Sequence, residues 1–275
     1  MWVFRLTSLE LALLIFGIVL GGTALGVFLG RRVRHLSGDL KEPFGVLQAA
    51  LLGVVGLILA FGLSLAVTRY EDRRASVVAE ANAIGTTYLR AQTLQEPARS
   101  KSLALLTRYT ERAVELSDTV PGSEGERTAA DREELLQRRL WALGGQAIEA
   151  EPVASAPRLY IETLNEMIDA QGVRVAALNN QVPIAVFLLE LVGAALALGL
   201  LASYLALLGR GVLAVALAAL LVSFLLLVIA DLDRPTRGMI RVPDTALRDE
   251  LASMRLPPAA APPSPGGELS GSLTP

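Results

Sequence analysis

The sequence predicts an all-α, polytopic membrane protein with four transmembrane helices and an extramembrane helical bundle between spans 2 and 3. Hydrophobic residues make up 52% of the 275 residues, charged residues only 19%, and the mean hydropathy is +0.48. This composition is too apolar for an ordinary soluble domain of that length. Four apolar runs are each long enough to cross a hydrocarbon core of ~30 Å. The polar segments repeat their apolar residues at helical spacing, and none alternates long enough to form a strand.

Residues 1–68 predict a first transmembrane hairpin, with spans at about 9–30 and 44–68. A signal peptide is the alternative for the first run. Only Arg5 precedes it and no small-residue cleavage site follows it, so we expect a retained span. Glycines recur within this run at four-residue spacing, at Gly17 and Gly21 and then at Gly22, Gly26 and Gly30. The spacing predicts a face that packs closely on another helix, although glycine is also simply common in membrane helices.

Residues 69–181 predict a helical domain that breaks near Pro97, at Pro121–Gly122 and within 151–157. Three segments between these breaks each carry one apolar stripe and one charged face, which suits a bundle. Acidic and basic residues are interspersed along the domain, and we expect them to form solvated, salt-bridged helix faces. More basic residues flank the spans on the side of this domain than on the other. This favours a cytoplasmic location, although the basic loop at 31–41 argues the other way.

Residues 182–230 predict a second transmembrane hairpin, with spans at about 183–208 and 211–230. Only Gly209–Arg210 joins these two spans, so they must run antiparallel. A membrane-proximal segment follows at 231–256, in which Leu247, Leu251 and Met254 indicate a short docked helix. The prolines of 257–275 are typical of a disordered tail.

The residue types available exclude most chemistry. Cysteine is absent and His35 is the one histidine, which excludes disulfides, thiolate metal sites and multi-histidine zinc sites. No nucleotide-binding or hydrolase motif occurs, and the net charge of −2 gives no attraction to nucleic acid. We therefore expect no enzyme, no cofactor and no metal. Asp231 and Asp233 suggest a cation site, but capping or pairing with Arg234 is the favoured interpretation.

Glu190 is the sharpest candidate for function within the spans. It lies two turns into the third span, where a carboxylate is costly and usually faces protein or water. A role in a pore, in a proton relay or between helices is one interpretation. Hydrogen bonding or snorkelling near the interface is the other.

The stretch Phe61–Tyr70, FGLSLAVTRY, resembles FYVTLVVTRW, with which the second span of animal bestrophins leaves the membrane. More closely, TRYEDRR, EANAIGTTYLRAQTL, LNEMIDAQGVRVAALNNQVP and DLDRPTRGMIRV are similar to segments of the uncharacterised bacterial bestrophin-like family. Two motifs carry the resemblance. The membrane-exit motif comprises Thr68, Arg69, Tyr70, Glu71 and Arg73, and the motif after span 4 comprises Asp231, Asp233, Arg234, Pro235 and Gly238.

The resemblance implies a pentameric anion channel for ions such as chloride, in a bacterial inner membrane, with the helical domain and both termini in the cytoplasm. Membrane lipid, further copies of the chain and small inorganic anions are the implied partners. The resemblance places an apolar pore neck at Gly53, Leu57 and Phe61, where Gly53 is smaller than the family pattern. Tyr70–Glu71 replaces the paired tryptophans of animal members. Their acidic calcium-binding cluster is missing, so calcium gating is not implied.

Two alternatives stay open. Leu57 and Phe61 could instead face lipid or pack within the bundle. The whole chain could instead be a non-conducting membrane scaffold or sensor whose helical domain binds a protein partner.

Overall fold

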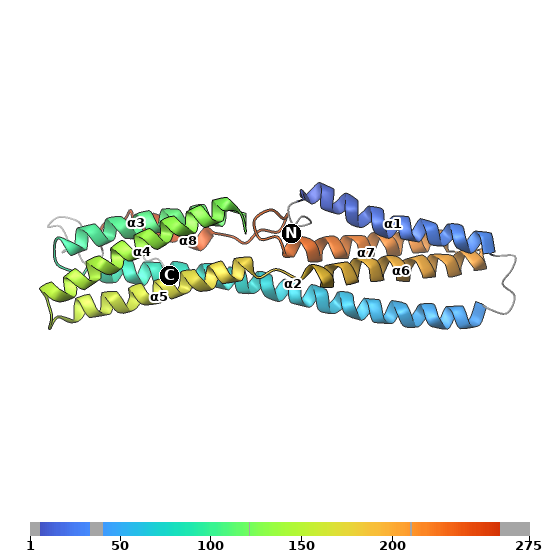
Figure 1. Cartoon of the computed structure of the whole chain (residues 1–275), viewed down its shortest axis with the longest axis horizontal. Helices are drawn as coiled ribbons and strands as arrows, with labels where there is room; N and C mark the ends of the chain where they lie inside the picture. The colour runs from blue at the N-terminus through green and yellow to red at the C-terminus, as the bar shows by residue number, and fades with distance from the viewer. Residues whose placement is uncertain (1–5, 34–40, 121, 210, 259–275) are drawn as a thin grey trace, which may run out of the picture. The chain divides into compact units, whose positions relative to one another are not determined.

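The computed structural model describes residues 6–33, 41–120, 122–209 and 211–258 (Figure 1). Arg5, His35 and most of the predicted Pro-rich tail lie outside these residues. The described chain is helical, and no residue of these ranges is in a strand. Four stretches are long and apolar enough to cross a membrane: Ser8–Val33, Phe44–Ala91, Ser155–Leu208 and Val212–Leu232. The predicted fold class, all-α with four membrane-spanning helices and a helical bundle between spans 2 and 3, is confirmed.

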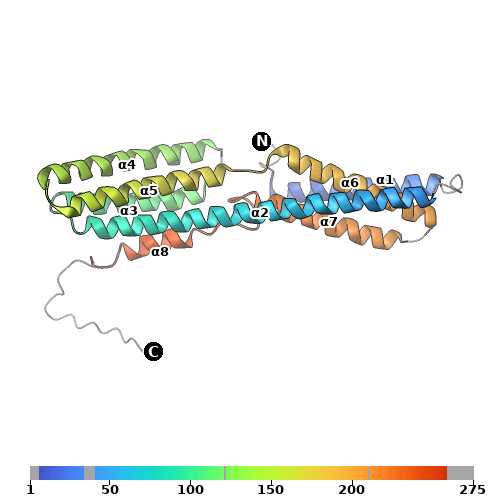
Figure 2. The ribbon, with the colours of Figure 1, turned by 90° about the horizontal axis from the view of Figure 1, so that it is seen from below.

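The chain divides into two compact units. Unit 1 comprises residues 1–75 and 176–242, and unit 2 comprises residues 76–175 and 243–275. Helix α2 (Lys41–Ala91) runs unbroken from unit 1 into unit 2 (Figure 2). Proline is absent from α2 beyond its first turn, so no residue interrupts its backbone hydrogen bonding where apolar sequence gives way to charge.

Unit 1 contains α1 (Ser8–Val33), the first part of α2, α6 (Ile184–Leu208) and α7 (Val212–Leu232). Helix α1 packs against both α6 and α7. Apolar side chains from all four helices form its core: Leu11, Ile15, Val19, Val55, Leu59, Ala66, Phe187, Leu191, Leu198, Leu226 and Ile229. Gly209 and Gly211 have φ values of 73° and 80°, a left-handed conformation that glycine adopts without strain. These glycines permit the tight connection between α6 and α7.

Glycines set the spacing between α1 and α6. A Cβ added to Gly26 would overlap the backbone of Gly199, and one added to Gly30 would overlap Ser203. Ser203 also donates a hydrogen bond of 2.9 Å from its Oγ to the carbonyl of Gly26. Gly17 and Gly21 instead have open space around them. Of the two glycine series in this span, only Gly22, Gly26 and Gly30 lie against α6.

Unit 2 contains the remainder of α2, α3 (Ala98–Ser117), α4 (Glu124–Ala150), α5 (Ser155–Asn179, in this unit up to Val175) and α8 (Thr245–Ser253). The helix α4 begins with reciprocal capping. Ser123 Oγ accepts from the Glu126 N–H at 3.2 Å, while the Glu126 carboxylate accepts from the Gly122 N–H at 2.6 Å. The predicted apolar stripes turn inward, and their buried members include Leu106, Leu116, Leu140 and Leu164. Leu247 brings α8 into the same core.

Candidate functional site

The residues expected to form a pore neck lie on one face of α2 that the chain itself leaves uncovered. Leu57 is 58% exposed and Phe61 is 63% exposed, and nothing lies within 4 Å of a Cβ added to Gly53. Val55 and Leu59, on the opposite face of the same helix, are buried in the core of unit 1. The four-residue spacing of Gly53, Leu57 and Phe61 keeps all three on the exposed face.

This uncovered face of α2 is less uniformly apolar than the exposed face of α7. It carries the large apolar side chains of Val54, Leu57, Phe61 and Leu65, and between and beyond them Ala60, Ser64 and Thr68, all exposed. The exposed face of α7 instead carries large apolar side chains: Leu213, Leu217, Leu220, Leu221 and Phe224. A leucine-rich face suits contact with lipid chains. The face of α2 mixes large apolar side chains with small and hydroxyl-bearing ones, which also suits contact with another helix or with water.

Glu190 lies between α6 and α2 and is only 2% exposed. Its carboxylate lies directly against the Cα of Gly62, so that a Cβ at this position would overlap the carboxylate oxygen Oε1. Gly62 is on the buried side of α2, away from Leu57 and Phe61. The carboxylate therefore contacts the back of the helix whose opposite face is uncovered.

The membrane-exit motif and the motif after span 4 meet at Arg73 and Asp233. Arg73 is 1% exposed, and its Nη2 donates to Asp233 Oδ1 at 3.1 Å. Its remaining donors bind carbonyls of Ala177 at 3.2 Å, Asn180 at 2.8 Å and Leu232 at 3.0 Å. The second carboxylate oxygen of Asp233 accepts the Val182 N–H at 2.8 Å. One guanidinium thus joins α2 to the ends of α5 and α7, using the several donors that only arginine offers.

Other members of the membrane-exit motif contribute unequally. Arg69 lies 3.9 Å from Asp233 and adds a second positive charge beside that carboxylate. Tyr70 is partly buried against the core of unit 1. Thr68 is exposed and donates to the Ser64 carbonyl within α2. Glu71 forms an exposed pair with Arg74 at 3.7 Å, a type of contact that contributes little to stability.

Asp231 organises the loop after α7. Its carboxylate accepts the backbone N–H groups of Met239 at 2.9 Å and Ile240 at 2.8 Å. Gly238 lies so close to Asp231 that a Cβ there would overlap it. Pro235 accepts the Val242 N–H through its carbonyl at 3.2 Å, and Arg234 donates to the Leu6 carbonyl.

The two aspartates make different contacts. Asp231 caps backbone N–H groups, and Asp233 pairs with Arg73 and Arg69 instead of with Arg234. Among the described residues, no group of three or more acidic, histidine or cysteine side chains could hold a metal ion.

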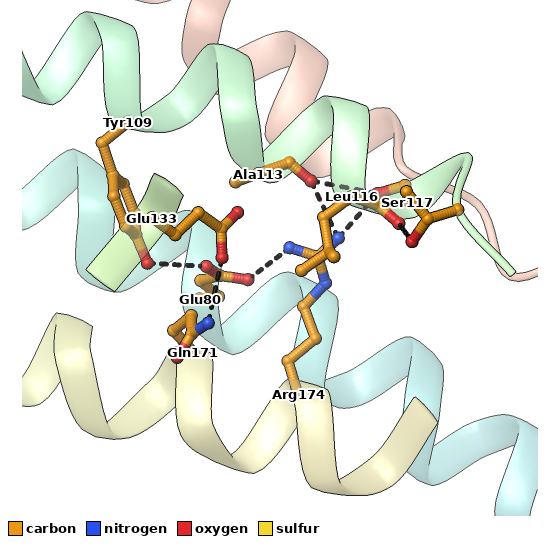
Figure 3. Close-up of polar contacts among 9 residues, drawn as sticks. Glu80, Tyr109, Ala113, Leu116, Ser117, Glu133, Gln171 and Arg174 are labelled. Carbon is orange, nitrogen blue, oxygen red and sulfur yellow. Dashed lines mark hydrogen bonds and ion pairs between the residues drawn. The ribbon is translucent and has the colours of Figure 1, made fainter. Parts of the chain in front are cut away.

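A buried polar network in unit 2 contradicts the expectation that its charges lie on solvated faces (Figure 3). Glu80 and Arg174 form an ion pair of 2.7 Å, and both side chains are 0% exposed. Tyr109 donates to the other oxygen of Glu80 at 3.0 Å. Arg174 also donates to the Ala113 carbonyl at 2.8 Å and to Ser117 Oγ at 2.7 Å. Helices α2, α3 and α5 are thereby joined by polar contacts inside the bundle.

Glu133 of α4 lies in the same network without a cationic partner of its own. Its Oε2 accepts from Gln171 Nε2 at 2.9 Å, and its Oε1 is buried without a hydrogen bond (Figure 3). Burial and the negative charge of Glu80 raise the pKa of Glu133 to about 7. Burial and the same carboxylate also raise the pKa of Tyr109 well above its usual value. Glu133 can therefore gain or lose a proton near neutral pH.

Sequence reasoning missed this network, although a signal was present. Glu80 falls among Val77, Ala81 and Ile84, which are all buried, so its position belongs to an apolar stripe. Arg174 falls seven residues after Met167 and four before Leu178, again on an apolar stripe. A charged residue at a stripe position of a bundle helix predicts a buried partner.

Solved structures with the same fold include bacterial bestrophin homologues. The homologue from Klebsiella pneumoniae superimposes with a TM-score of 0.62 at 16% identity, covering 86% of this chain and 98% of that chain. A variant of the Klebsiella pneumoniae homologue gives a TM-score of 0.63 at 16% identity, covering 86% and 96%. Curated protein sequences gave no match. The family model for the Bestrophin-like domain matches residues 13–247, and the chain therefore belongs to the Bestrophin-like family.

Proposed function

We propose that the chain forms a homo-oligomeric, pentameric channel in the bacterial inner membrane that is permeable to small inorganic anions such as chloride. In this proposal α2 of every copy lines a common axis, and surrounding membrane lipid covers the outer helices. The helical domain, residues 69–181, and both termini lie in the cytoplasm. The channel has no catalytic role.

The uncovered face of α2 is the observation that carries the proposal. Leu57 and Phe61 project from unit 1 while Val55 and Leu59 form its core, so each chain presents Leu57 and Phe61 outward. Repeated around an axis, Leu57 and Phe61 form two stacked apolar rings one turn apart. Such rings can block ions by excluding water until the pore widens. Gly53, one turn before Leu57, has no side chain, so the proposed pore is wider at that level.

The charges near this face support passage of anions. The stretch 44–68 contains no acidic residue. Glu190 contacts α2 from behind, at Gly62, and so does not face the proposed axis. Exposed hydroxyl groups at Ser64 and Thr68 supply polar contacts on the axis side. A pore with this lining has no ring of carboxylates to repel anions.

A single introduced thiol tests the proposal, because the chain has no cysteine of its own. We expect liposomes containing the wild-type chain to conduct chloride, and a charged thiol-reactive reagent to block flux through F61C. The matched control is F224C, on the leucine-rich face of α7, where Phe224 is 55% exposed. The reagent should leave F224C conducting.

Phe61→Ala completes the test by removing the narrower ring. We expect higher chloride flux than in wild type, because the ring widens. Absence of flux in wild type and F61A alike, from a folded oligomer, would contradict the channel proposal. That result would favour the non-conducting scaffold or sensor.

The proposed orientation has its own test. A reporter enzyme that is active only in the cytoplasm is fused after residue 256, and in a second fusion it is inserted at 34–40. We expect activity from the first fusion alone. Activity from the second alone would place the helical domain outside the cytoplasm.

A further inference from the structure

Residues 237–241, here called the RGMIR loop, expose an apolar pair between two arginines. Met239 is 78% exposed and Ile240 is 38% exposed. Arg237 and Arg241, on either side, are exposed as well. Two adjacent exposed apolar side chains flanked by basic ones are typical of a segment that meets both lipid chains and headgroups.

The loop lies at the level where two spans end. Asp231, in the last turn of α7, binds the backbone N–H groups of Met239 and Ile240, so the loop returns to the end of that helix. Ser8, the first residue of α1, donates from Oγ to the Arg237 carbonyl at 3.3 Å. Both α1 and α7 are candidate spans, and the loop contacts the first turn of one and the last turn of the other. These contacts place it at one membrane–water boundary.

The conformation of the loop is fixed by contacts within unit 1. The Gly238 N–H donates to the Arg234 carbonyl at 3.1 Å, and Arg241 Nε donates to the Gly238 carbonyl at 3.4 Å. Gly238 packs against Asp231 so closely that no larger residue fits. Because the backbone of Met239 and Ile240 is held by Asp231, their side chains stay directed outward.

We propose that the RGMIR loop binds anionic phospholipids. Met239 and Ile240 enter the boundary between headgroups and acyl chains, while Arg237 and Arg241 donate hydrogen bonds to lipid phosphates. Anionic lipid is the partner that complements the charge of the loop, which carries two positive charges and no negative one. Anionic headgroups surround the end of a span at this level. The proposal does not depend on whether the chain conducts ions.

Native mass spectrometry of the full chain in detergent, titrated with phosphatidylglycerol or phosphatidylcholine, tests the proposal. We expect R237Q/R241Q to bind phosphatidylglycerol about 30-fold more weakly, or about 2 kcal/mol at about 1.4 kcal/mol per factor of ten. Phosphatidylcholine binding should not change. R237K/R241K, which keeps the charge, should retain most of the preference. M239S/I240S should weaken binding of both lipids.

A charge-matched control is R132Q/R139Q, which removes two exposed arginines of α4 and should leave lipid binding unchanged. Wild-type affinity in R237Q/R241Q, or equal losses in it and in the control, would overturn the proposal. A fall in oligomer mass with unchanged lipid preference would also overturn it, because the loop would then contact a second copy of the chain.

Discussion

Arg174→Met should destabilise unit 2 strongly, because it leaves Glu80 buried without its cation. The substitution keeps the length and apolar stem of the side chain but removes the donors to Glu80, Ala113 and Ser117. Tyr109 then still donates its hydroxyl hydrogen bond to Glu80. A buried carboxylate with one neutral donor must either stay charged at high cost or take up a proton.

The expected loss of stability in R174M is large because both partners of the ion pair are completely buried. Breaking a buried ion pair by removing one partner costs about 3–5 kcal/mol. Glu80 and Arg174 are both 0% exposed, so little screening by solvent reduces this value. Arg138→Met is the matched control, because Arg138 and Glu134 are 76% and 58% exposed and pair at 2.6 Å. That surface pair contributes less than about 1 kcal/mol. Replacing both buried partners, in E80L/R174M, should recover most of the loss.

Hydrogen exchange of the full chain in detergent measures the effect within the bundle. The slowest amides of α3 and α5 should exchange about 100- to 5,000-fold faster in R174M, at about 1.4 kcal/mol per factor of ten. Exchange in R138M should stay within a few fold of wild type. If R174M and R138M behaved alike, the ion pair would not hold these helices together.

Three further perturbations address Glu133, the α1–α6 contact and Asp233. The folded pKa of Glu133, about 7, lies above its unfolded value, so its contribution is present at low pH and lost as pH rises through about 7. The free energy of unfolding should therefore fall by about 2–3 kcal/mol from about pH 5 to about pH 8, and E133Q should remove this slope. Gly26→Leu should lower the thermal midpoint of unfolding, at a cost of about 3 kcal/mol or more, because its side chain meets the Gly199 backbone, whereas Gly17→Leu should not. Asp233→Asn should cost about 2–3 kcal/mol in the same thermal assay, because Arg73 keeps its carbonyl partners but loses its counter-ion.

For each of these three predictions, one outcome would contradict the reasoning. An unchanged pH slope in E133Q would show that another group carries the proton. Equal midpoints for G26L and G17L would mean that α1 and α6 do not pack through Gly26. A wild-type midpoint for D233N would show that Arg73 needs only its carbonyl acceptors.

The spans were predictable because each depends on local composition. An apolar run of sufficient length must become a helix in a membrane, and Gly209 and Gly211 bracket a turn that sequence alone indicates. The continuation of α2 through Arg73 also depends on local sequence, since no proline interrupts the helix there. Close contact through Gly26 was predicted from spacing, whereas the open surroundings of Gly17 show that spacing does not identify the partner helix.

Ion pairs between distant parts of the chain were not predictable. Arg73 and Asp233 are separated by 160 residues, and which arginine meets this aspartate depends on how α5 and α7 end. The charge pattern favoured capping or pairing with Arg234, its neighbour in sequence. The same limit applies to Glu80 and Arg174, whose burial follows from packing of three helices.

Single-particle imaging of the full chain in lipid nanodiscs examines the proposed assembly most directly. We predict a pentameric ring with α2 innermost and Phe61 facing the axis. A monomer, a dimer, or a ring that places Phe61 toward lipid would contradict a central pore built from the second spans.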